Sequence, residues 1–271
     1  MRNLFVSLSV ATFATACAGG SAGPMLEYGP SDAPLRYQID GSTESVIETP
    51  MGTQNEGGSI AATVTVEIGA PGDGGRNVTV VYEALETSGA ATGRLDPGEL
   101  IGQPFRGILE SDGEISFTEA PKTPSALARY FDPSAFLSQM LMPTPPGGAA
   151  DLESWPVYQQ ATERTEMTVT STFEGTARVV GDTTWNGVVA KIVAVDGEFQ
   201  MEGSGTPTGS PAELDMLVTG TGTSRFVWDA TRGVMLASVS EGGGAGTVAI
   251  PSMDLSMPMS LTSKQTTELQ R

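Results

Sequence analysis

The sequence predicts a mainly β (α+β) fold in which antiparallel hairpins are accompanied by one or two short helices. Of its 271 residues 34 are Gly and only 6% are aromatic, a composition that favours strands and turns. Apolar and polar residues alternate along many segments, and Gly- and Pro-rich turns separate those segments. Helical spacing of apolar residues occurs in one stretch, residues 124–142.

Residues 1–16 have the pattern of an export signal. Arg2 precedes the apolar run Leu4–Ala14, and the small residues Ala14-Thr15-Ala16 stand directly before Cys17. The run is too short to span a hydrocarbon core of about 30 Å, which needs ~20 residues. We therefore predict a signal peptide that is removed before Cys17.

Cys17 is the sole cysteine, and we predict that it is acylated. Ala14-Thr15-Ala16-Cys17 resembles the lipobox of bacterial lipoproteins, although Ala14 stands where Leu is usual and also suits ordinary signal peptidase. Residues 17–34 then form the lipidated cysteine and a flexible tether. Many Gram-negative lipoproteins that stay in the inner membrane carry an aspartate directly after the lipidated cysteine, whereas this sequence has Ala18 there. The resemblance therefore implies an outer-membrane lipoprotein facing the periplasm. A secreted or free periplasmic protein is the alternative.

The first half of the body is expected to consist of strands. Leu35–Ile47 alternates, Gly57-Gly58 is expected to break the chain, and Ser59–Ile68 pairs with Asn77–Leu85 as a long hairpin. A second hairpin turns at Asp112-Gly113, a dipeptide typical of tight turns.

Residues 124–142 predict two short helices. Asp132 can cap the second helix, which has Pro133 in its first turn. Phe136, Leu137, Met140 and Leu141 recur at helical spacing, so this face is expected to lie buried on the sheet. The Pro-rich passage 143–148 ends the helical stretch.

The second half repeats the strand-and-turn pattern, with tight turns at Asn186-Gly187 and Thr231–Gly233. The expected strand segments are Glu166–Val180, Val188–Met201 around Asp196-Gly197, Glu213–Trp228, Gly233–Val239 and Ser252–Leu269. Within the second of these, Asp196 is expected at a turn position. Gly242–Gly246 is expected to be a flexible loop. Residues 35–271 are interpreted as one β-rich domain. Two pseudo-repeated halves, 35–123 and 157–271 joined by 124–156, are the open alternative.

The order of these elements also indicates a family. A hairpin from Gly107-Ile108-Leu109 to Gly113, the helices, the Pro-rich passage and Glu153-Ser154-Trp155 precede a long meander. This layout resembles a group of uncharacterised bacterial lipoproteins, similar in plan to the half-barrel carriers LolA and LolB and to mycobacterial lipid-binding lipoproteins. The resemblance spans most of residues 35–271 and implies a large twisted antiparallel sheet with the helices on its concave face.

That fold implies a pocket for an acyl chain. Met is suited to variable apolar ligands because its side chain is flexible. The candidate lining residues are Phe136, Met140, Met142, Met253, Leu255, Met257 and Met259. Ordinary core packing is the alternative for each of them, since any one-sided sheet shows apolar alternation.

Composition excludes several kinds of chemistry. The chain has no His, and acylation would consume its only thiol, so Ser-His-Asp and Cys nucleophiles and the usual zinc ligands are excluded. With 14 Lys and Arg against 32 Asp and Glu, a net charge of −18 disfavours nucleic acid and anionic lipid surfaces.

We therefore expect a non-enzymatic, lipid-anchored envelope protein without metal or cofactor, which contacts the membrane through its N-terminal acyl chains and binds an apolar or lipid ligand. Two alternatives stay open: a carboxylate-dependent envelope hydrolase, since the chain has 32 acids, and a purely structural or interaction lipoprotein.

Overall fold

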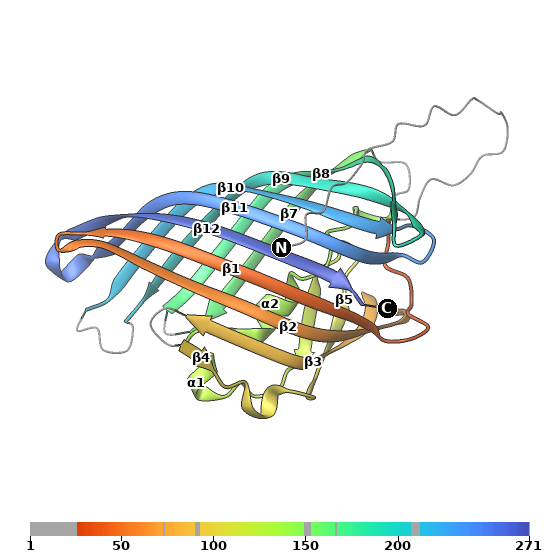
Figure 1. The fold of residues 1–271 in the computed structure, drawn as a ribbon, viewed down its shortest axis with the longest axis horizontal. Helices are drawn as coiled ribbons and strands as arrows, with labels where there is room; N and C mark the ends of the chain where they lie inside the picture. Colours follow the sequence, from red (N-terminus) through yellow and green to blue (C-terminus); the bar gives the residue numbers. More distant parts are fainter. Residues whose placement is uncertain are drawn as a thin grey trace.

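The structure, a computed structural model, describes residues 26–72, 74–89, 93–148, 153–165, 167–206 and 212–270 (Figure 1). The predicted signal peptide and Cys17 lie outside the described residues. Within this part of the chain, no helix is long and apolar enough to cross a membrane.

The described residues form twelve strands of one sheet. Their bounds are β1 Leu35–Thr49, β2 Gly52–Gly72, β3 Gly75–Gly89, β4 Gly93–Leu95, β5 Pro104–Leu109, β6 Ile115–Glu119, β7 Ser154–Arg164, β8 Met167–Trp185, β9 Val188–Gly205, β10 Leu214–Asp229, β11 Val234–Ile250 and β12 Leu255–Leu269.

All pairings in the sheet are antiparallel, and the strand order is β6-β5-β3-β2-β1-β12-β11-β10-β9-β8-β7, with β4 beside β3. The sheet is open, and β6 and β7 are its edges. Strands from both halves of the sequence belong to this sheet and meet where β1 pairs with β12. The predicted mainly β antiparallel fold is confirmed.

Two short helices, α1 (Ser125–Ala128) and α2 (Pro133–Ser138), lie in the stretch where the sequence predicts them. Asp132 caps α2 as predicted, because its Oδ1 accepts hydrogen bonds from the backbone N–H groups of Ser134 at 3.0 Å and Ala135 at 3.1 Å. Leu127 and Leu137 anchor the helices in the main core. Figure 1 shows the sheet curling around α2.

The main core fills one end of the curled sheet. Its largest fully buried side chains include Tyr37, Tyr82, Phe105, Trp155 and Trp228. The Tyr37 hydroxyl donates a hydrogen bond of 2.9 Å to the carbonyl of Met235, so this polar group is satisfied inside the core. At the other end, the β1–β2 and β11–β12 hairpins reach well past the helices (Figure 1).

Three expectations about glycine were wrong. Gly57-Gly58 lies inside β2, Asp196-Gly197 lies inside β9, and Gly242–Gly246 is part of β11 rather than a loop. Sequence analysis also missed β7, in which Pro156 stands on an edge strand, where a missing N–H is tolerated. Glycine normally weakens strands, so its presence inside three of them needs a structural reason.

The reason is a row of small residues that crosses the sheet. Gly175, Gly197, Gly222 and Gly242 pair directly with one another across β8, β9, β10 and β11. The row continues through Ser263 of β12, Thr43 of β1, Gly58 of β2 and Gly89 of β3. We refer to these eight residues as the glycine row.

Large side chains lie flat on the bare backbone at this row. A Cβ added at Gly197 would come within 2.6 Å of Phe173 Cζ, and one at Gly175 within 2.8 Å of Phe173 Cε1. A Cβ at Gly244 would similarly lie 2.9 Å from Phe199 Cζ. The glycines therefore make room for the two aromatic rings against the sheet.

This arrangement predicts that Gly197→Ala destabilises the fold. The new Cβ would also lie 2.4 Å from the carbonyl oxygen of Glu174, so relieving the clash requires backbone movement. We expect a loss of about 1–3 kcal/mol in the free energy of unfolding, measured by urea denaturation. Gly181→Ala is the matched control, because a Cβ there meets nothing within 4 Å. Equal stability of the two variants would contradict the role given to the glycine row.

Candidate functional site

The first described residues cross the core end of the sheet as an N-terminal strap, Leu26–Ser31. Gly29 N–H donates to the carbonyl of Gly233 at 3.0 Å, and Ser31 N–H donates to that of Ile68 at 2.9 Å. Tyr28 packs edge-on against Trp228, with ring centroids 4.8 Å apart. The strap thus links the turn at Gly233 to Ile68 of β2, two positions that lie far apart in the sequence.

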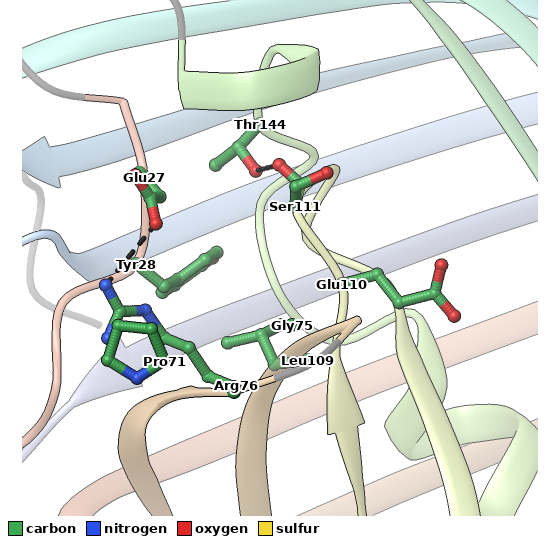
Figure 2. Close-up of a pocket in the computed structure, with 10 residues that line it drawn as sticks. Glu27, Tyr28, Pro71, Gly75, Arg76, Leu109, Glu110, Ser111 and Thr144 are labelled. Atoms are coloured by element: carbon green, nitrogen blue, oxygen red, sulfur yellow. Dashed lines mark hydrogen bonds and ion pairs between the residues drawn. The ribbon is translucent and has the colours of Figure 1, made fainter.

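A cavity of about 200 Å³ lies beside this strap (Figure 2). Its lining residues are Glu27, Tyr28, Pro71, Gly72, Gly75, Arg76, Leu109, Glu110, Ser111 and Thr144. The Arg76 side chain is 12% exposed, and one of its terminal nitrogens lies 3.3 Å from Glu27 Oε1. The other donates to the carbonyl of Gly69 at 3.5 Å, whereas the buried Nε has no partner within the described residues.

The hydroxyl groups of Thr144 and Tyr28, which line this cavity, form hydrogen bonds with the backbone. Thr144 Oγ1 donates to the carbonyl of Ser111 at 2.9 Å (Figure 2), and the Tyr28 hydroxyl accepts from the N–H of Met142 at 2.6 Å. Burial raises the pKa of the Tyr28 hydroxyl well above its usual value, so this group stays protonated at neutral pH. The cavity is therefore best explained as a seam between the strap and the body.

The adjoining β5–β6 turn carries three acids, which bear on the hydrolase alternative. Burial raises the pKa of the Glu114 carboxyl, and the nearby carboxylates of Asp112 and Glu110 raise it further. However, Asp112 Oδ1 accepts from Glu114 N–H at 3.1 Å and Glu110 Oε1 accepts from Ser116 Oγ at 2.5 Å. Two of these acids thus stabilise their own turn. Among the described residues there is no cluster of His, Cys, Asp and Glu that could hold a metal ion.

The inner face of the sheet, which is continuous with the core, is free of charge over its central strands. Side chains alternate between the two faces of a strand. In the paired parts of β8 to β12, every Asp, Glu, Lys and Arg falls on the outer face. These parts are Met167–Val179, Val193–Gly205, Leu214–Phe226, Ser238–Ile250 and Leu255–Leu269. On that face the ion pairs Arg178–Asp196 at 2.7 Å and Lys264–Glu241 at 2.5 Å join neighbouring strands.

Beyond the glycine row, toward the hairpin tips, the inner face is lined by large apolar side chains. We define the apolar band by Phe173, Phe199, Met201, Met216, Val218 and Met259. Val218 is fully buried, and the other five remain partly exposed. A Cβ added at Gly203 would lie 3.1 Å from Met216 Cε, so here too a long side chain packs against the backbone of a glycine. The band is thus a layer one side chain thick.

The structure does not bring the predicted lining residues together in one pocket. Met140 and Met142 are buried in the main core, and Phe136 packs at its margin. Met257 and Met259 lie at the start of β12, and Leu255 begins that strand. Met257 is ten residues, about 33 Å of strand, from Thr267, which lies level with the core.

Met253 lies outside both groups, because it stands at the β11–β12 turn and is 60% exposed. Sequence analysis missed Phe173, Phe199, Met201 and Met216 as members of the band. Their alternation with polar residues was visible in the sequence, but their common level became visible only with the strand register.

Comparison with known proteins adds little. No family model matches the sequence, and no curated protein matches it. Among solved structures, a loop L8 deletion mutant of OmpT, an outer membrane protein of Vibrio cholerae, is 8% identical with a TM-score of 0.24, over 88% of this chain and 99% of that chain. In-vitro folded OmpT is 9% identical with a TM-score of 0.19, over 89% and 98%. Likenesses this weak establish neither a family nor a function.

The strap predicts a stability effect at Tyr28. Tyr28→Phe leaves the Met142 N–H without its acceptor in a buried position, which we expect to cost about 1–3 kcal/mol in the free energy of unfolding. Tyr158→Phe is the matched control, since Tyr158 is 59% exposed. Urea denaturation of both variants checks this. A neutral Tyr28→Phe variant would show that the strap is not held by this bond.

Proposed function

We propose that this chain is a non-enzymatic, lipid-anchored protein of the bacterial cell envelope that binds an apolar ligand, such as an acyl chain, on the apolar band. The observation that carries the proposal is the band itself: large apolar side chains, partly exposed, on an inner face that carries no charged residue over the paired parts of β8 to β12. Contiguous exposed apolar surface is typical of a binding site.

The shape of the band suits a long, thin ligand. From Ser224, just below the glycine row, to Met216 the strand extends by eight residues, or about 26 Å. Methionine and phenylalanine side chains dominate the surface, and methionine in particular adapts to ligands of varying shape. An acyl chain lying along the strands would cover the band and remove its apolar surface from water.

Anchoring rests on the sequence. The export signal, the sole cysteine at position 17 and the small-residue tether are the features of a lipoprotein. The N-terminal strap adds a constraint on geometry, because the chain enters the fold at the core end of the sheet, beside Gly233 and Ile68. The described chain therefore begins at the core end, and the apolar band lies toward the opposite end.

Ligand binding is tested by placing a charge on the band. Met201→Lys should lower uptake of a fluorescent fatty acid by the purified protein about tenfold, because a lysine there loses hydration without gaining a partner. Gln200→Lys is the matched control, since the neighbouring residue points outward. Thermal unfolding of both variants checks that they fold. The proposal fails if the parent protein neither takes up the probe nor copurifies with lipid.

Anchoring has its own test, the intact mass of the protein extracted from its native membrane. We expect residues 17–271 plus acyl chains, and loss of both the added mass and membrane sedimentation in Cys17→Ser. An unmodified mass in the soluble fraction would leave a secreted or free periplasmic protein.

A further inference from the structure

From a level of polar residues below the apolar band, we infer that the ligand is an amphiphile with one acyl chain and an uncharged, hydroxyl-bearing head group. This inference rests on the proposed function and adds the class of ligand. It places the acyl chain on the apolar band and the head group at the glycine row and the residues below it.

The polar level lies one step toward the core from the glycine row. Ser224, Ser240 and Gln265 pair directly with one another on β10, β11 and β12, and Ser224 Oγ donates to Ser240 Oγ at 2.8 Å. Thr87 of β3 lies on the same level, since Gln265 pairs with Gly41, Gly41 with Ile60 and Ile60 with Thr87. Thr267 follows two residues deeper on β12. We call Thr87, Ser224, Ser240, Gln265 and Thr267 the polar belt.

Two members of the polar belt are buried without a hydrogen-bond partner. Thr267 is 1% exposed and Thr87 is 7% exposed, and the Oγ1 atom of each lacks a partner within the described residues. A buried hydroxyl without a partner is unfavourable. Thr267 pairs with Ser238, which is also buried, so its side chain points to the inner side of the sheet.

The glycine row gives a head group room above the belt. At Ser263, Thr43 and Gly58 the inner face carries only small side chains. A Cβ added at Gly41 would lie 2.9 Å from Ile60 Cγ2 and 3.9 Å from Gln265 Cγ, so the side chains of Ile60 and Gln265 both lie beside Gly41 on this face. The Gln265 amide and the serine hydroxyls can both donate and accept hydrogen bonds, as can the hydroxyls of a glycerol or sugar.

Charge favours an uncharged head group. The inner positions of the belt and the glycine row lack Asp, Glu, Lys and Arg, so a charged head would be buried without an ionic partner. An anionic head would also meet the field of a chain with net charge −18.

The test compares two competitors with the same acyl chain on the exported Cys17→Ser protein. We expect monopalmitoylglycerol to displace the fluorescent fatty acid at a concentration about tenfold lower than palmitoyl lysophosphatidate does, because only the phosphate is a buried unpaired charge. Gln265→Leu should still take up the probe, but the two competitors should then displace it at nearly equal concentrations, so that the ratio of these concentrations is close to one. Thr262→Val, an outward-facing exposed position on the same strand, should leave the ratio unchanged.

The outcomes separate the two proposals. Uptake of the probe with equal displacement by both competitors, or with better displacement by lysophosphatidate, overturns the uncharged head group and leaves apolar binding in place. Uptake without displacement by either competitor overturns it as well. Absence of uptake together with absence of copurified lipid overturns both proposals, and a copurified lipid with a charged head group overturns the uncharged head group. A Gln265→Leu variant that keeps the full tenfold ratio shows that the polar belt does not select the head group.

Discussion

The sheet is much longer than the helices that cover it, and this mismatch shapes the rest of the molecule. A strand of 15 residues such as β12 extends about 50 Å, whereas the six residues of α2 extend about 9 Å. The helices, the strap and the aromatic core can therefore bury the inner face at one end only. The remaining inner face has to be stabilised by the sheet's own side chains.

The glycine row allows the sheet's own side chains to cover this part of the inner face. Phe173 and Phe199 lie down on bare backbone and cover it, and Met216 does the same over Gly203. Because the covering layer is one side chain thick, its outer surface stays apolar and partly exposed. The same arrangement thus explains both the glycines inside strands and the surface that we propose as a ligand site. Along the inner face of the sheet, the core is followed by the polar belt, then by the glycine row, and then by the apolar band.

Much of the fold was predictable from local patterns. Alternation located β1, β10 and β12, Asn186-Gly187 and Gly233 marked tight turns with positive φ, and Asp132 marked the start of α2. Apart from the missed strand β7, the failures were of one kind: glycines were taken as breaks or loops. Their effect on the fold depends on rings contributed by other strands, and register across strands is a tertiary property that local sequence does not show.

For the same reason, the sequence pointed to Met257 and Met259 on one strand but could not assemble the band around them. The most direct test is photo-crosslinking with a fatty acid that carries a diazirine at the end of its chain, followed by mass spectrometry of the adducts. The account predicts adducts on Phe199, Met201 or Met259. Adducts confined to the seam beside the strap, at Pro71 or Leu109, or to the outer face would contradict it.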